Sequence, residues 1–137
     1  MTIKEKELDF IWRLNDYINT LNLFAWSDVG VLDVEESISL MAMPGGEEKL
    51  FMDGTREKNY QMQVNAKSKN QLHCIESLSK AATALESLKA NEIKSDNGTF
   101  DFDSNKITSL LSLVGQDEQG YFIYAFSLSA KITIYGE

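Results

Sequence analysis

The stretch from Met43 to Leu72 decides the fold, and it reads MPGGEEKLFMDGTREKNYQMQVNAKSKNQL. Pro44 ends any strand that precedes it, because a proline has no N–H group to donate to a sheet. The pair Gly45-Gly46 then lets the chain turn freely into a charged loop. The pair Asp53-Gly54 is a strong signal for a tight hairpin turn. We therefore predict a β-hairpin whose charged loop protrudes from a sheet.

Two regular elements follow this hairpin within the same stretch. From Asn59 to Lys67, apolar residues alternate with polar ones, which is typical of a half-buried strand. Asn70 is a good helix N-cap. Apolar residues recur at helical spacing after it, so we expect a helix from Gln71 to Ala90.

The same two periodicities predict the remaining elements. Helical spacing predicts a first helix, and Thr2 with Glu5 forms a possible capping box at its start. Period-two alternation predicts further strands, the last two of which form an antiparallel hairpin. The predicted elements are a helix over Thr2–Leu23, a turn over Ser27–Gly30, strands over Ser37–Met43, Ile107–Val114 and Phe122–Ile134, and a short strand or loop over Thr99–Phe102.

This order of elements predicts an α+β fold. Short turns join most of the strands, so we expect a mostly antiparallel sheet with two helices packed on one face and a protruding β-hairpin. The chain has 137 residues, of which 43% are apolar and 25% charged, as in an ordinary globular protein. This length is typical of one domain, so we expect a single domain over residues 1–137.

The net charge and the cysteine content limit the classes of function that this chain can have. The formal net charge of -8 argues against a nucleic-acid-binding protein, which needs a basic surface to release counterions from phosphates. The single cysteine, Cys74, precludes an internal disulfide and favours a reducing compartment. Residues Met1–Glu7 lack the apolar core of a signal peptide. No apolar run approaches the roughly 18 residues of a membrane span, so we expect no membrane association.

His73 and Cys74 are adjacent in the sequence, which suggests a catalytic base and nucleophile. Neighbouring side chains on a helix point about 100° apart, so these two cannot meet. Cys74 lies beside the apolar stripe of the predicted helix, and we interpret it as a small core residue.

Asp101, Asp103 and Asn105 match the first positions of a calcium-binding loop. The pattern then fails, because Lys106 and Ser112 stand where it requires glycine and glutamate. No cysteine or histidine spacing is typical of zinc. We therefore expect no metal, no cofactor and no enzymatic activity.

The stretch from Met43 to Leu72 resembles part of a known protein family. The segment Met43–Gly46, the Asp53-Gly54 turn, the Tyr60–Lys67 strand and Lys69–Gln71 before a leucine-rich helix resemble the minor capsid or tail terminator proteins of long-tailed bacteriophages. The resemblance covers most of the chain in the order of its elements. It implies a structural virion protein that caps the tail tube, ends its polymerisation and forms the head-to-tail joining surface.

The same resemblance implies the partners and the location of the chain. The partners are the chain itself in a homohexameric ring, the tail tube protein and a head-completion protein. DNA would cross the channel of the ring without specific binding, as suits an acidic protein. The implied location is the virion, and the host cytoplasm during assembly.

A head-to-tail ring needs two different complementary patches on each subunit. One candidate is the Pro44–Lys58 loop, and the other is the polar face of the strands. We expect Arg56 and Lys67 to pair with acidic groups of a neighbouring subunit. The candidate interface residues are Glu47, Glu48, Asp53, Arg56 and Lys58 in the loop, and Gln61, Gln63, Asn65, Lys67, Ser127, Ser129 and Lys131 on the strands.

Two other classes of function remain open on the residues alone. One is a different structural phage protein, such as a head-completion or tail tube protein. The other is a small non-catalytic ligand-binding or regulatory domain. That class requires a pocket between helices and sheet, lined by Trp12, Trp26 or Phe126.

Overall fold

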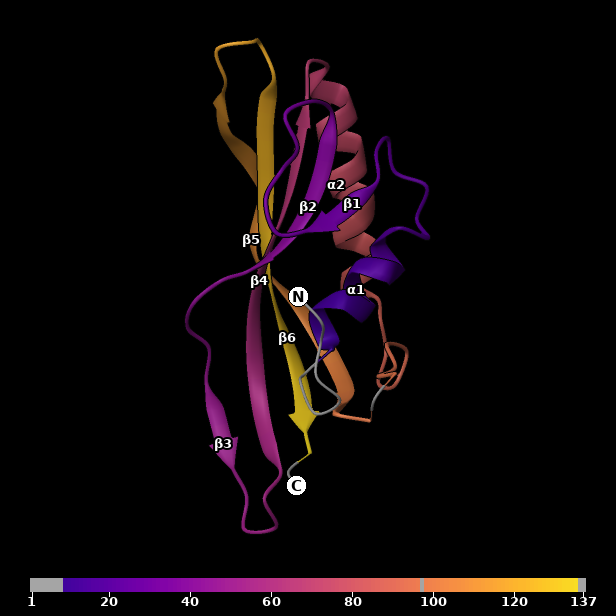
Figure 1. Ribbon diagram of the computed structural model, residues 1–137, viewed down its shortest axis with the longest axis vertical. Coiled ribbons are helices and arrows are strands. Elements are labelled where there is room, and N and C mark those ends of the chain that lie inside the picture. Colours follow the sequence, from indigo (N-terminus) through magenta and orange to yellow (C-terminus); the bar gives the residue numbers. More distant parts are fainter. Residues whose placement is uncertain (1–8, 97, 136–137) are drawn as a thin grey trace.

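The computed structural model describes residues 9–96 and 98–135 and has the predicted α+β class (Figure 1). It contains two helices and a mostly antiparallel six-stranded sheet. The elements are α1 (Phe10–Ile18), β1 (Ser27–Val29), β2 (Ser37–Ala42), β3 (Glu48–Leu50), β4 (Arg56–Ser68), α2 (Gln71–Glu86), β5 (Phe100–Gln116) and β6 (Phe122–Ile134). The predicted helix start and the Thr2–Glu5 capping box lie outside the described residues.

The strand order in the sheet is β1-β2-β4-β6-β5, and β3 pairs with β4 beside this path. Strand β4 is antiparallel to β6 from Arg56 opposite Ile134 to Ser68 opposite Phe122. On its other side, β4 pairs with β2 along its second half and with β3 at its start. Among the paired strands that the structure describes, only β1 and β2 are parallel. The β3–β4 hairpin therefore extends to one end of the long axis of the molecule (Figure 1).

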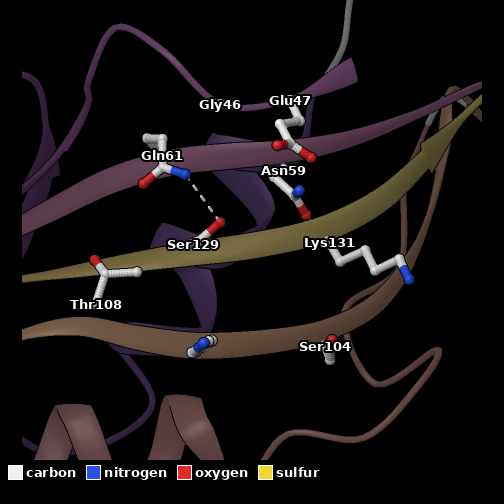
Figure 2. Close-up of a pocket in the computed structure, with 9 residues that line it drawn as sticks. Gly46, Glu47, Asn59, Gln61, Ser104, Thr108, Ser129 and Lys131 are labelled. Carbon is white, nitrogen blue, oxygen red and sulfur yellow. Dashed lines mark hydrogen bonds between the residues drawn. The ribbon is translucent and has the colours of Figure 1, made fainter. Parts of the chain in front are cut away.

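One face of the sheet is polar. The odd-numbered residues of β4 and β6 lie on it, and Gln61 is directly opposite Ser129 in the register. The Gln61 side-chain amide donates a hydrogen bond to Ser129 Oγ at 3.1 Å (Figure 2). This open face is the surface on which the predicted strand residues lie.

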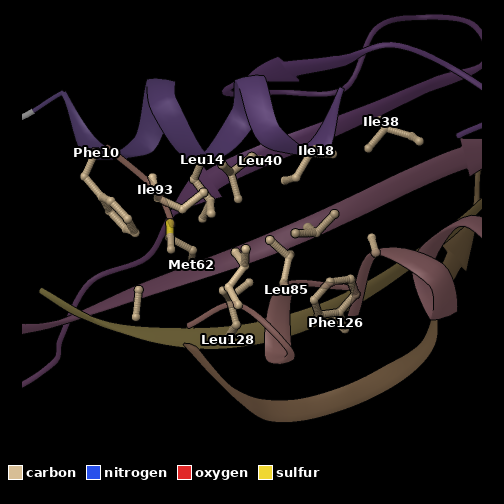
Figure 3. Close-up of a cluster of buried hydrophobic side chains, with 14 of the residues drawn as sticks. Phe10, Leu14, Ile18, Ile38, Leu40, Met62, Leu85, Ile93, Phe126 and Leu128 are labelled. Atoms are coloured by element: carbon tan, nitrogen blue, oxygen red, sulfur yellow. The ribbon is translucent and has the colours of Figure 1, made fainter. Parts of the chain in front are cut away.

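The other face carries the hydrophobic core, to which both helices contribute (Figure 3). Fully burying a large apolar side chain contributes about 1.5–3 kcal/mol, so this cluster is a main source of stability. Its members are each less than one tenth exposed, and most of them come from the two helices and four of the strands. Among them are Phe10, Leu14 and Ile18 of α1, Leu78 and Leu85 of α2, Ile38 and Leu40 of β2, Met62 and Val64 of β4, Phe102 of β5 and Phe126 and Leu128 of β6.

The predicted N-cap of α2 is confirmed, since the backbone N–H of Leu72 donates to Asn70 Oδ1 at 3.0 Å. Both predicted helix ends are wrong. Helix α1 ends at Ile18, because the side chain of the next residue, Asn19, hydrogen bonds to β1. Helix α2 ends at Glu86 instead of Ala90. The apolar pattern that predicted a longer helix includes Leu88, which lies beyond the end of α2 but is still buried.

The predicted turn at Ser27–Gly30 is wrong, because Ser27–Val29 forms strand β1. The amide side chains of Asn15 and Asn19 both bond to the Ser27 backbone, and Gly30 N–H donates to the Leu40 carbonyl at 2.9 Å. A three-residue strand held by long-range side-chain bonds has no period-two signal in the sequence.

The predicted segments Thr99–Phe102 and Ile107–Val114 are not separate pieces, because one long strand, β5, runs from Phe100 to Gln116. Strand β5 uses 17 residues to pair with the 13 of β6, and its register shifts at four places. Each β-bulge inserts one residue and reverses the alternation of faces. Because of these bulges, the sequence of β5 shows no continuous period-two alternation, and the strand could not be recognised as one element. The predicted antiparallel pairing of the last two strands is confirmed.

Candidate functional site

The β3–β4 hairpin is closed by its own turn residues. Phe51 N–H donates to the Thr55 carbonyl at 2.8 Å, and Gly54 N–H donates to the Phe51 carbonyl at 3.0 Å. Asp53 Oδ1 accepts hydrogen bonds from the Thr55 hydroxyl at 2.7 Å and from its N–H at 3.0 Å. These two bonds lower the pKa of the exposed Asp53 carboxyl. The predicted Asp53-Gly54 turn is thus an ordered structure.

The base of the hairpin is a close crossing of two backbones. Asn59 N–H donates to the Glu47 carbonyl at 2.8 Å. Gly46 has a φ of +95°, and a Cβ at this position would lie 2.0 Å from the Asn59 carbonyl oxygen. Only glycine fits such a contact, so Gly46 sets the path of the loop towards β3.

The tip of the hairpin is apolar, and its residues were not among the interface residues predicted from the sequence. Leu50, Phe51 and Met52 are consecutive, and their exposed fractions are 74%, 46% and 107%. A run of three exposed apolar residues is unusual unless it meets a partner. The signal was in the sequence, as an apolar triplet directly before the Asp53-Gly54 turn. We call Leu50–Met52 the hairpin tip.

Two of the charged hairpin residues form an ion pair with each other. Arg56 Nη1 lies 3.2 Å from Glu48 Oε1, across the β3–β4 pairing. Lys58 lies opposite Glu48 in the register, and its Nζ is 5.4 Å from the centre of the Tyr60 ring. Glu47 lies further up, at the edge of the open face (Figure 2).

The open face brings together several predicted residues from β4 and β6. Gln61 and Ser129 lie side by side, and Lys131 is within 3.7 Å of Glu57 and 3.8 Å of Asp103. Figure 2 shows Gln61, Ser129 and Lys131 at a shallow polar groove. Its lining consists of Gly46, Glu47, Asn59, Gln61, Ser104, Lys106, Thr108, Ser129 and Lys131. The groove offers amides, hydroxyls and the charges of Glu47, Lys106 and Lys131.

Two of the predicted interface residues, Asn65 and Lys67, make their polar contacts within the subunit. Asn65 is only 6% exposed, donates to Ser39 Oγ at 3.2 Å and accepts from Gln63 Nε2 at 2.7 Å. Lys67 Nζ lies 3.2 Å from Asp117 Oδ2 and also donates to the Asp33 carbonyl at 3.2 Å. Contact of Lys67 with a neighbouring subunit stays a prediction, as does that of Arg56.

A second groove lies between α2 and β5, on the side of the molecule that carries the helices. It has a volume of about 520 Å³. Leu110, on its rim, is 82% exposed. Its lining is mainly small or apolar and consists of Ser79, Ala82, Thr83 and Glu86 of α2 and Ile107, Leu110 and Leu111 of β5. We call it the α2–β5 groove.

The residues that suggested a nucleophile are engaged elsewhere. The His73 ring stacks on Phe24 at 5.6 Å. Cys74 is fully buried, and its Sγ lies 3.7 Å from the Phe122 carbonyl oxygen. Burial and the nearby Glu36 charge raise the pKa of the Cys74 thiol to about 11. The thiol is therefore protonated at neutral pH and is a poor nucleophile.

The partial calcium pattern is also dispersed. Asn105 turns its amide towards the helices and donates to the Leu85 carbonyl at 3.0 Å. Asp101 accepts a hydrogen bond from the Tyr135 hydroxyl, while Asp103 lies near Lys131. No group of three or more His, Cys, Asp or Glu side chains within residues 9–96 and 98–135 is arranged to hold a metal ion.

The aromatic residues proposed for a ligand pocket do not form one together. Phe126 belongs to the core and is 1% exposed, while Trp12 and Trp26 lie at the surface. No helix in the described part of the chain is long and apolar enough to cross a membrane.

A comparison with protein-family models found one match, to a family described as bacteriophage tail terminator protein, over residues 17–134. The matched range starts near the end of α1 and ends with the last residue of β6. It therefore includes the whole sheet, the hairpin and α2. A comparison with curated proteins found no match.

Proposed function

Because the chain belongs to the bacteriophage tail terminator protein family, we propose that it caps the phage tail tube, ends tube polymerisation and forms the surface that joins tail to head. Its structural role in the tail and its place in the virion follow from the family. The observation that carries the finer proposal is the extent of the match, since residues 17–134 include the whole sheet, the hairpin and α2.

A terminator must bind the growing tube without offering a new site for the next tube subunit. We propose that the chain does so as a homohexameric ring, with the tail tube protein on one side and a head-completion protein on the other. The elongated subunit supports this arrangement, because the hairpin projects at one end of its long axis and the β5–β6 turn at the other (Figure 1). The two sides of a ring built from such subunits differ chemically.

DNA has to pass such a ring without adhering to it. The net charge of -8 supports this role, because acidic groups repel phosphates. The open face contributes uncharged amides and hydroxyls, and the charge of Lys131 is offset by Glu57 and Asp103. Such a surface has few free cations to hold a DNA backbone.

A structural role also agrees with the chemistry of the described residues. Neither Cys74 nor His73 is placed to act as a nucleophile or a base, since one is buried and protonated and the other stacks on Phe24. Assembly of the proposed ring takes place in the host cytoplasm.

The test is tube assembly in solution with the tail tube protein of the same phage. The chain is added at increasing ratios, tube lengths are measured by electron microscopy, and the mass of the chain is measured by light scattering. The proposal predicts shorter tubes at higher ratios and a discrete species of six subunits, alone or on tube ends. Tubes that elongate equally at every ratio would overturn it.

A further inference from the structure

Two of the exposed apolar surfaces of the described subunit differ in shape, since one projects and the other is hollowed. The hairpin tip is convex and ends in Met52, whose side chain is fully exposed. The α2–β5 groove is concave and is lined by Ala82, Ile107 and Leu111 among others. Buried aromatic and methionine side chains in a matching pocket are typical anchors of protein interfaces.

The subunit cannot close this contact on itself. Arg56, next to the hairpin turn, lies in the row of Ile134, whereas Ile107 of the groove lies in the row of Leu128. Six residues of β6 separate these rows, a distance of roughly 20 Å at about 3.3 Å per residue. The tip also points away from the rest of the sheet (Figure 1). A tip that occupies this groove must therefore come from another molecule.

Strand β5 lies at the edge of the sheet but is poorly suited to backbone pairing with another chain. Its register against β6 shifts at four places, among them between Ser109 and Ser112, beside the groove. Bulges of this kind interrupt the row of free backbone groups that a new strand would need. Leu110 is exposed at the rim, while its neighbour Leu111 packs against the core. A partner at this edge would therefore be bound mainly through side chains.

The charges beside the two surfaces are opposite and unpaired within the subunit. Lys49 precedes the tip, and Glu86 lines the groove. Within residues 9–96 and 98–135, neither makes an ion pair, whereas Arg56 and Glu48 of the hairpin pair with each other. A lysine at a rim and a glutamate at the facing rim would align two copies of the chain.

We propose that the hairpin tip of one copy of this chain occupies the α2–β5 groove of the next copy, with Lys49 facing Glu86. The inference rests on the proposed ring and identifies the surfaces that build it. The contact is heterologous, since each subunit gives its tip on one side and its groove on the other. Repeated around an axis, it closes a ring and leaves the open polar face uncovered.

Covalent crosslinking tests the contact directly in the full chain. Met52 and Leu110 are both exposed, so Met52→Cys and Leu110→Cys leave the fold unchanged, and the native Cys74 is buried. With a short bismaleimide, the double variant is expected to give a ladder of covalent species up to six subunits, in the presence of tail tube protein if the ring needs it. Each single variant is the control and gives no species beyond a dimer.

A charge exchange tests the same contact without crosslinking. Lys49→Glu places two glutamates face to face and is expected to lower the fraction of ring at least several-fold. Adding Glu86→Lys restores the opposite pair and the ring. Glu76→Lys, which adds the same charge on the same helix outside the groove lining, is the control and should restore nothing.

The outcomes separate the two proposals. If the wild-type chain forms rings and limits tube length but the double-cysteine variant forms no ladder, and Lys49→Glu assembles normally, the tip-in-groove contact is wrong and the terminator function stands. If the wild-type chain neither forms rings nor affects tubes, both proposals fail.

Discussion

The backbone of Ser27 and the side chain of Asn19 exchange two hydrogen bonds. Ser27 N–H donates to Asn19 Oδ1 at 2.7 Å, and Asn19 Nδ2 donates to the Ser27 carbonyl at 2.9 Å. The amide thus supplies the pairing that a further strand would give to β1. Asn15 adds to it, because the Ser27 hydroxyl donates to Asn15 Oδ1 at 2.6 Å. These hydrogen bonds terminate α1 at Ile18 and hold Ser27 at the start of β1.

We expect Asn19→Ala to destabilise the chain by about 1–3 kcal/mol, because it leaves the buried N–H of Ser27 without an acceptor. The measurement is the free energy of unfolding in urea. Asn59→Ala is the matched control, since the Asn59 side chain makes no hydrogen bond among the described residues and should cost little. Equal losses in the two variants would show that the exchange contributes nothing.

Gly46 should tolerate no side chain. A methyl group there would lie 2.0 Å from the Asn59 carbonyl oxygen, and backbone must move to admit it. Gly45→Ala is a close control, since Gly45 also has a positive φ, +100°, but nothing lies within 4 Å of its Cβ position. We expect Gly46→Ala to cost about 1–3 kcal/mol more than Gly45→Ala in urea unfolding, as overpacking does. The same loss in both would mean that backbone strain alone matters.

Strands β4 and β6 and the start of α2 were predictable because local signals agree there. Alternation, the Asp53-Gly54 turn and the Asn70 cap each act within a few residues, and each is present in the structure. The errors lie where residues that are distant in the sequence determine the ends or the continuity of an element. Asn19 ends α1 by bonding to a strand eight residues away, and β5 stays continuous because its bulges follow the register of β6.

The candidate site was only partly accessible to sequence reasoning for a similar reason. Charged and polar residues were selected by type, but their exposure depends on neighbours in the sheet. Lys67 makes an ion pair with Asp117, a residue 50 positions away in the chain. Asn65 is buried, although its strand neighbour Gln63 is partly exposed. The apolar α2–β5 groove combines two elements that no local pattern connects.

The Asp9 carboxylate ties the start of α1 to the loop before β5 and should make stability depend on acid pH. Its oxygens accept hydrogen bonds from Ser95 Oγ at 2.7 Å, Asp96 N–H at 2.8 Å and Thr99 Oγ1 at 3.1 Å. Burial alone would raise the pKa of Asp9, but these bonds outweigh it and hold the pKa below its ordinary value of 3.8. A carboxyl with a depressed pKa stabilises the fold above its unfolded pKa and loses this effect as pH falls through the folded value.

Asp9→Asn should therefore be less stable than wild type at neutral pH, and the difference should shrink as pH falls below about 3.8. Urea unfolding of both proteins from pH 7 downwards measures it. Asp28→Asn serves as a control, because Asp28 is exposed and makes no hydrogen bond or ion pair among the described residues. A difference between wild type and Asp9→Asn that stays constant with pH would contradict the assigned role of the carboxylate.

Replacing Glu47–Thr55 by a short Gly-Ser linker should separate folding from assembly. Strand β4 keeps its full pairing with β6 without the hairpin, so we expect cooperative thermal melting to persist. Tube-length control should be lost, because the tip and its flanking charges are gone. A milder variant that changes only Leu50, Phe51 and Met52 to serine keeps the backbone of β3 and the Arg56–Glu48 ion pair. If this variant melts like wild type and no longer limits tube length, the apolar tip is the part of the hairpin that assembly needs; full activity would show that the hairpin acts through its charges.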